Sequence, residues 1–179
     1  MTRPDDDRLR EVFAKVERHV EDRWGVPVLI SDVPNPFTGD LDGAEIQVDY
    51  DQTVEDALFI LVHLFGHTVQ WNSSEEERRI GQPRSGPWSE ADLAEVERYE
   101  REACEYSLQL LHECGVFDLD AWLSDFAACD HAYLDHFYRT GEKHPFRSFW
   151  QDGRPCLSPR PIPPFTPTRW RSRWDGVVI

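Results

Sequence analysis

Two histidines, His63 and His67, stand four residues apart in a strongly apolar stretch of the sequence, LFILVHLFGHTVQW. On a helix, residues at this spacing share one face, and their Cβ atoms are roughly 5–6 Å apart. Two imidazoles placed in this way can hold one zinc ion, each with a Zn–N distance of about 2.0–2.1 Å. The spacing therefore favours a metal site, and the alternative is a pair of core histidines bonded to carbonyl groups or water.

The zinc-protease pattern H-E-x-x-H has a glutamate directly after the first histidine, where it acts as the general base. Here the stretch reads HLFGH, so Leu64 occupies that position. Leucine cannot take a proton from a zinc-bound water, a contribution worth typically 10²–10⁴-fold in rate. The sequence therefore predicts metal ligands without the general base. We expect Leu64, at the position of that base, to border a cleft. A displaced acid, for instance Glu102, is the alternative source of a base.

The histidines belong to a predicted helix over residues 53–71, which begins with Thr53 and Asp56 in a capping-box-like arrangement. Its central turns are almost wholly apolar, so most of its circumference must be buried. Gly66 lies in the interior of this helix, where glycine is unfavourable, and this predicts the close approach of another backbone. Apolar spacing and capping signals predict three further helices, over residues 5–24, over residues 89–114, and from Asp118 or Asp120 to residue 140.

Two short strands are predicted before the histidine helix. Residues 28–30 form an apolar run, and residues 44–50 alternate between apolar and polar side chains, as in a half-buried antiparallel strand. Residues 31–43 and 72–88 are rich in turn-forming residues and are predicted to be loops. The predicted fold class is therefore α+β, mainly helical, with a small antiparallel sheet packed on the histidine-bearing helix.

The composition changes after residue 140. Six prolines between Pro155 and Pro167 exclude regular helix, and residues 141–179 hold seven Lys or Arg against three Asp or Glu. This segment also contains three large apolar side chains whose exposure to water would be unfavourable, namely Trp150, Trp170 and Trp174. We therefore expect a domain over residues 1–140 and an extended tail over residues 141–179 that wraps on it.

The chain of 179 residues has 40% hydrophobic and 30% charged residues, which is typical of a soluble globular domain. Its formal net charge of −15 argues against direct nucleic-acid binding, because phosphate contacts need a basic surface. No apolar run approaches the ~20 residues of a membrane helix, and the first residues, MTRPDDDRLR, are not those of a signal peptide. Four widely spaced cysteines without a C-x-x-C pair favour a reduced, cytoplasmic protein.

Two helical histidines need a third protein ligand, and a glutamate from a following helix is one established solution. The segment EVERYEREACEYSLQLL, residues 95–111, offers several glutamates, which are equally typical of a solvated helix face. His131 and His136 are five residues apart, a poor spacing for one face, and are predicted to decorate the last helix. The alternative is that one of them supplies a fourth ligand or stabilises an oxyanion.

Three segments in order, GAEIQVDY, LFILVHLFGHTVQW and YEREACEYSLQLL, resemble the ImmA/IrrE-like family of minimal gluzincin metallopeptidases. The family shows a strand, a helix of the form hxxLAHExGH, and a helix with E-x-x-A-[ND]-x-F-A-x-x-L-L. On the last pattern Glu100 takes the place of the ligand glutamate, and Cys104 stands where Asn or Asp is usual. The resemblance covers roughly residues 8–115. It implies a minimal zincin-like core with Zn²⁺ held by His63, His67 and Glu100.

Three functions are consistent with these residues. The favoured one is a zinc-binding metallopeptidase homologue that lacks the catalytic glutamate and acts as a regulatory or scaffold protein. The alternatives are an active, atypical zinc endopeptidase with a relocated general base, and a metal-free protein-interaction module. Because family members often act beside a DNA-binding repressor, the resemblance implies another protein, a regulator or a substrate, as the partner.

Overall fold

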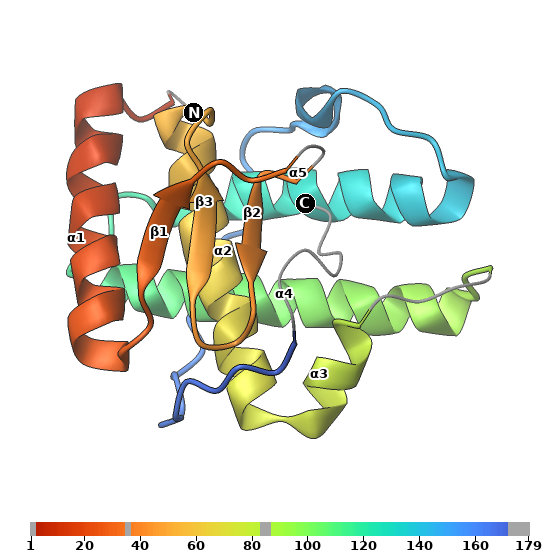
Figure 1. The fold of residues 1–179 in the computed structure, drawn as a ribbon. Helices are drawn as coiled ribbons and strands as arrows, with labels where there is room; N and C mark the ends of the chain where they lie inside the picture. Colours follow the sequence, from red (N-terminus) through yellow and green to blue (C-terminus); the bar gives the residue numbers. More distant parts are fainter. Residues whose placement is uncertain (1–2, 35–36, 83–86, 172–179) are drawn as a thin grey trace.

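The computed structural model describes residues 3–34, 37–82 and 87–171, and most of them are helical (Figure 1). The elements in chain order are α1 (Asp6–Trp24), β1 (Val28–Ser31), β2 (Gly39–Leu41), β3 (Ile46–Asp49), α2 (Val54–Ser73), α3 (Glu75–Ile80), α4 (Glu90–Glu113), α5 (Asp120–Thr140) and the 3₁₀ turn η1 (Phe146–Phe149). The mainly helical α+β character predicted from the sequence is confirmed. None of the helices in the described residues has both the length and the apolar character needed to cross a bilayer.

The sheet has three strands in the order β1-β3-β2, and it is mixed rather than antiparallel as predicted. β1 pairs with β3 in parallel, whereas β2 pairs with β3 in antiparallel register. β2 lies in the segment predicted to be a loop, and that prediction was wrong. A strand of three residues, Gly39–Leu41, is too short to show an alternating pattern, and only its ladder with β3 makes it a strand.

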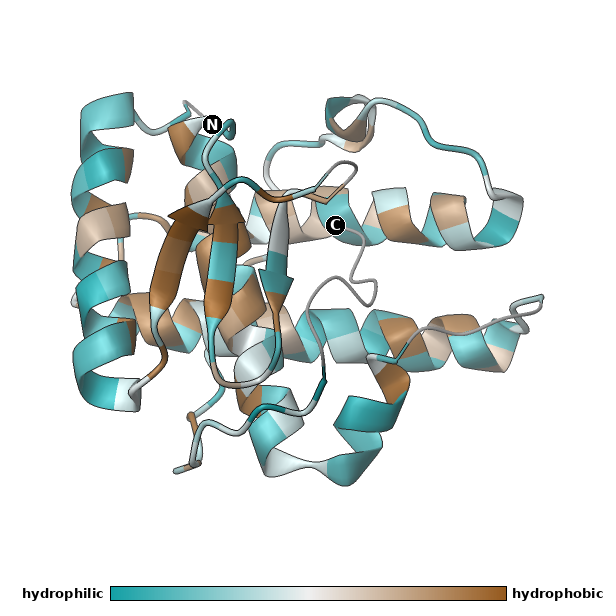
Figure 2. Cartoon of the chain, in the orientation of Figure 1, coloured by the Kyte–Doolittle hydropathy of each residue, from teal (hydrophilic) through white to brown (hydrophobic). Residues whose placement is uncertain are grey.

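α2 is the central helix of the fold. It packs against α1, α4, β2 and β3, and every residue from Leu58 to Trp71 is buried. The Thr53 hydroxyl accepts a hydrogen bond from the backbone N–H of Asp56, which confirms the predicted helix start. Figure 2 shows hydrophobic residues gathered on β1, β3 and the helix behind them, while the outer face of α1 is mostly hydrophilic.

The other long helices begin and end close to the predicted residues. Ser89 and Asp92 form a capping box at the start of α4, and Gly141 ends α5 in the left-handed conformation. α4 and α5 run side by side in opposite directions (Figure 1). The short helix α3 was missed, because its six residues carry a side-chain cap from Ser74 but no buried residue and hence no apolar periodicity.

Residues 142–171 follow an extended path along the helices. The backbone N–H groups of Gly153 and Arg154 donate to the buried carboxylate of Asp125 on α5. Further on, Arg160 pairs with Glu105 of α4 at 2.9 Å. These bonds attach the segment to two separate helices.

The end of this segment reaches α2 and the turn between β2 and β3. The backbone N–H of Thr168 donates to the Asn72 side chain, and so does the indole of Trp170, which is 43% exposed. Trp150 packs its ring edge-on to Phe126 of α5. Trp174, the third tryptophan that we expected to be covered, lies outside the described residues.

We predict that Phe165→Ala lowers the free energy of unfolding by about 1–3 kcal/mol, less than for a fully buried phenylalanine. The half-buried Phe165 ring stacks on Trp24 with centroids 5.2 Å apart, so its loss uncovers the indole. Urea unfolding measures the change. Phe117→Ala is the control, because Phe117 is 62% exposed and its removal should change stability by less than about 0.5 kcal/mol. Equal effects of the two substitutions would contradict the prediction.

Candidate metal centre

His63, His67 and Glu100 come together in the structure, and all three are buried. Nε2 of His63 and Nε2 of His67 are 3.0 Å apart. Oε2 of Glu100 lies 3.2 Å from the first of these nitrogens and 3.1 Å from the second. Three ligands of a tetrahedral zinc ion, each about 2.0–2.1 Å from the metal, would be about 3.3–3.4 Å apart. The three side chains are therefore positioned to bind a metal ion of that size.

A close contact between two helix backbones brings Glu100 to the histidines. A Cβ atom added to Gly66 would overlap the backbone of Ala103 on α4, and this confirms the predicted approach. Ala103 lies three residues after Glu100, on the same face of α4. The missing side chain of Gly66 therefore allows α4 to place its glutamate against both histidines.

The tautomer of His67 is determined by Gln70. The Gln70 amide nitrogen donates to the carbonyl of Tyr99 at 2.8 Å, so the amide oxygen must face His67 Nδ1, 2.9 Å away. That oxygen only accepts, so Nδ1 of His67 carries the proton. Nε2 of His67 then directs its lone pair toward His63 and Glu100, and these three residues are called the triad below. Ligand histidines in zinc sites are oriented in the same way, by a second hydrogen bond.

His63 is held in a similar way by Cys104, whose Sγ lies 3.4 Å from Nδ1 of His63. Cys104 therefore contacts a candidate ligand. Burial and the neighbouring His67 lower the pKa of His63 to about 4, so its imidazole is neutral near pH 7, as a metal ligand requires. Burial raises the pKa of Glu100, but its electrostatic interactions with His67 and His63 outweigh this effect, and the net pKa is below the usual range.

Leu64 does not border a cleft, and that expectation was wrong. It is 0% exposed in the hydrophobic core, and its side chain lies against β2, where a Cβ added to Gly39 would be 2.9 Å from it. The proposed substitute base is also elsewhere, because Glu102 pairs with Arg98 at 3.2 Å and with Arg160 at 3.3 Å. Leu64 has no carboxylate, and the carboxylate of Glu102 is paired with arginines, so neither position supplies a base to the three candidate ligands.

The remaining histidines do not join the three ligands. His136 lies near Glu142 and His144 at the exposed end of α5, where these three side chains form a second group that could hold a metal. His131 lies closer to the triad: it lines a pocket of about 480 Å³ between α4 and α5 together with Glu100. Among the three candidate ligands, only Glu100 lines this pocket.

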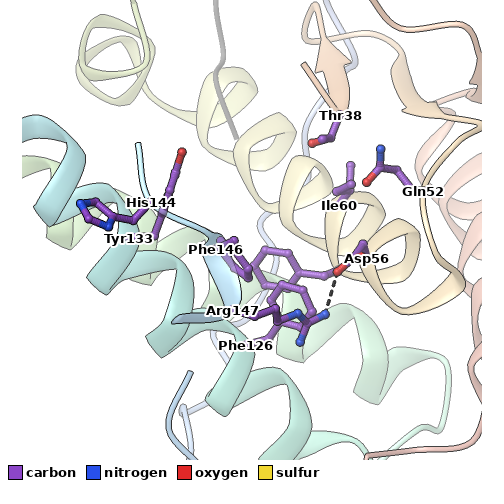
Figure 3. Close-up of a pocket in the computed structure, with 10 residues that line it drawn as sticks. Thr38, Gln52, Asp56, Ile60, Phe126, Tyr133, His144, Phe146 and Arg147 are labelled. Atoms are coloured by element: carbon purple, nitrogen blue, oxygen red, sulfur yellow. Dashed lines mark hydrogen bonds and ion pairs between the residues drawn. The ribbon is translucent and has the colours of Figure 1, made fainter. Parts of the chain in front are cut away.

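A second pocket, of about 260 Å³, lies near the start of α2 and is drawn in Figure 3. Its lining includes Phe59, Phe126 and the ion pair between Asp56 and Arg147. The Phe59 ring stacks on Phe126 and also on His63, with centroids 3.9 Å and 5.2 Å away. The Phe59 ring therefore lies between this pocket and His63.

The sequence interpretation missed one buried acid near the triad, Asp130 of α5, which is 1% exposed. It lies four residues after Phe126, in a helix whose buried face is otherwise largely apolar. An aspartate at an apolar position of a periodic helix was the signal that could have identified it.

Comparison of the chain with models of protein families, with curated proteins and with solved structures found no match. Membership of the ImmA/IrrE-like family therefore stays a prediction, and the case for a metal depends on the geometry of the site.

We predict that the metal-free protein loses stability as the pH falls from about 6.5, the ordinary His pKa, to about 4, the pKa of folded His63. In this window the unfolded chain binds a proton that the folded state excludes, so acidification favours unfolding. The His63 contribution to the free energy of unfolding should fall by on the order of 2 kcal/mol between pH 7 and pH 5. Urea unfolding with a chelator present measures it as the difference in pH slope between the wild type and His63→Gln. Identical slopes would contradict the assignment.

Proposed function

We propose that this chain is a zinc-binding metallopeptidase homologue that has lost catalysis and acts as a regulatory or scaffold protein. The observation that carries the proposal is the convergence of three possible metal ligands. Nε2 of His63, Nε2 of His67 and Oε2 of Glu100 face one another at 3.0–3.2 Å where α2 packs on α4, and all three side chains are buried. A divalent cation between these atoms would be held by all three of them.

The donor set favours zinc over other common cations. Two imidazole nitrogens and one carboxylate oxygen are the ligands of many gluzincin-type sites, whereas Ca²⁺ and Mg²⁺ prefer oxygen ligands alone. Spacings of 3.0–3.2 Å are also short for Ca²⁺, whose bonds of 2.3–2.6 Å would separate its ligands further.

The loss of catalysis is supported by the packing around position 64. Leu64 belongs to the core against β2, so no carboxylate can reach the metal from the position that H-E-x-x-H uses. A metal that holds α2 and α4 together still stabilises the fold, because binding energy to the folded state adds to its stability. The partner in this proposal is another protein, as the family resemblance implies.

The first test is zinc content. Protein purified without chelator should hold about one zinc per chain, and His63→Ala or His67→Ala should each remove it, since two ligands do not hold the ion. Elemental analysis after gel filtration gives the stoichiometry. His19→Ala is the control, because His19 pairs with Glu113 far from the triad and its loss should leave the zinc content unchanged. Full zinc retention when both triad histidines are replaced would refute the proposal.

The second test is catalysis. The zinc-loaded wild type should not cleave an unstructured peptide, because no base stands beside the metal at position 64. Mass spectrometry of the incubated peptide detects cleavage. Zinc-dependent cleavage by the wild type, abolished by His67→Ala and by chelator, would establish the atypical peptidase instead.

Leu64→Glu provides a structural check on the same point. We predict that it lowers the free energy of unfolding by about 2–4 kcal/mol, because it places a carboxylate in the core. Leu64→Met, which conserves volume and character, should cost less than about 1.5 kcal/mol. A Leu64→Glu protein as stable as the Met variant would show that the position is open to solvent after all.

A further inference from the structure

Asp130 is a buried acid that the fold itself does not use. It is 1% exposed, and neither of its carboxylate oxygens has a hydrogen-bond partner among the described residues. A buried carboxylate without a partner is unfavourable for folding. By contrast, Asp125 on the same helix accepts two backbone N–H groups, and buried Glu55 accepts the indole N–H of Trp122. Asp130 therefore needs an explanation that the folded chain does not supply.

The position of Asp130 places it beside the metal centre. It lies one turn after Phe126, which stacks on Phe59, and Phe59 stacks in turn on His63. Its helix, α5, packs against α4, which carries Glu100. Burial and the charge of Glu100 raise the pKa of Asp130 well above its ordinary value, so the two carboxylates lie within electrostatic range.

A second electrostatic contact supports this position. Burial raises the pKa of the Cys104 thiol, and the charge of Asp130 adds to the effect. Cys104 is the residue whose sulfur lies 3.4 Å from Nδ1 of His63. Asp130 is thus near both Glu100 and the residue that orients His63.

Asp130 is not a direct ligand in this arrangement. The ligand atoms of His63, His67 and Glu100 lie within 4.8 Å of one another, and no oxygen of Asp130 belongs to that group. A direct zinc ligand would lie about 3.3 Å from the other three, whereas a hydrogen-bonded water adds about 2.7–2.8 Å of reach. A site with three protein ligands commonly has a water in its fourth position. A carboxylate on the neighbouring helix that is not itself a ligand is a candidate to hold that water.

The charge of the site gives an independent reason for a second acid. Two neutral imidazoles and one carboxylate leave a divalent cation with a net charge of +1 in a buried centre. Buried charges are tolerated when they are paired. An ionised Asp130 makes the centre neutral.

We propose that Asp130 is a positioning residue of the metal centre, whose carboxylate accepts a hydrogen bond from the water in the fourth coordination position and balances the remaining positive charge. This inference rests on the proposed zinc binding. It assigns a role in holding the metal and is independent of peptide cleavage.

The test compares Asp130→Asn with Asp125→Asn in the full chain, with zinc itself as the probe. Zinc affinity is measured by competition with a fluorescent chelator, and the stability of the metal-free protein by thermal unfolding. Asp130→Asn should weaken zinc binding about 10–100-fold, as is typical for groups that support metal ligands. Without metal it should be at least as stable as the wild type, because it removes an unpaired buried carboxylate. Asp125→Asn should show the opposite pattern, with lower metal-free stability and unchanged affinity.

Each outcome has one meaning. If Asp130→Asn binds zinc as tightly as the wild type, or if it destabilises the metal-free protein as Asp125→Asn does and leaves the affinity unchanged, the inference is overturned. If the asparagine variant does not fold, Asp130→Ala is measured in the same way and the same criteria apply. If the wild type binds no zinc, the proposed function fails first, and this result is distinct from a failure of the Asp130 inference alone.

Discussion

The contact between the backbones of Gly66 and Ala103 is the constraint on which the site depends. A side chain at position 66 would overlap Ala103, so the two helices can cross at this distance only with glycine there. Glycine in a helix interior costs roughly 0.8–1.0 kcal/mol relative to alanine. The chain carries this unfavourable residue in its most buried helix, directly before His67. The close crossing gives Glu100 its position against both histidines.

Two polar contacts fix the register of α2 against α4 on either side of that crossing. Ser107 donates its hydroxyl proton to the carbonyl of Val62, and Gln70 donates to the carbonyl of Tyr99, both at 2.8 Å. Buried hydrogen bonds are directional, so a shift of one helix along the other would leave these groups unpaired. Gln70 also bonds to His67, and the same side chain therefore sets both the helix register and the tautomer of a candidate ligand.

The sequence predicts those features of the site that depend on residues close together in the chain, and it does not predict those that depend on contacts between distant elements. The histidine pair follows from local helical spacing, and the helix ends follow from caps such as Ser89 and Gly141. Glu100 is one of several glutamates in its segment, and only the family pattern singled it out. The packing of Leu64, and the lack of a hydrogen-bond partner for Asp130 among the described residues, depend on which residues of distant elements lie opposite these side chains. Local periodicity carries no information about contacts between distant elements.

The same reasoning explains the errors in the sheet. Parallel pairing of β1 with β3 is a long-range choice, and the antiparallel partner of β3 is the three-residue strand β2, which shows no pattern of its own. This short strand matters for the site, because Gly39 in β2 leaves room that the Leu64 side chain fills. The base position of the zinc-protease pattern is therefore closed by packing as well as by the change of residue type.

The candidate ligands and the base position of the H-E-x-x-H pattern lie in different surroundings in this fold. The ligands and the groups that orient them lie at the crossing of α2 and α4, whereas the base position points to the sheet and is part of the core. Leu64 belongs to the hydrophobic core and points away from the candidate ligands, since it lies about 100° around the helix from His63. Asp130, the buried acid on α5 without a hydrogen-bond partner among the described residues, lies on the side of the candidate ligands and not on the side of position 64. A pair of helices can therefore bring three possible metal ligands together without placing a carboxylate at the position after the first histidine.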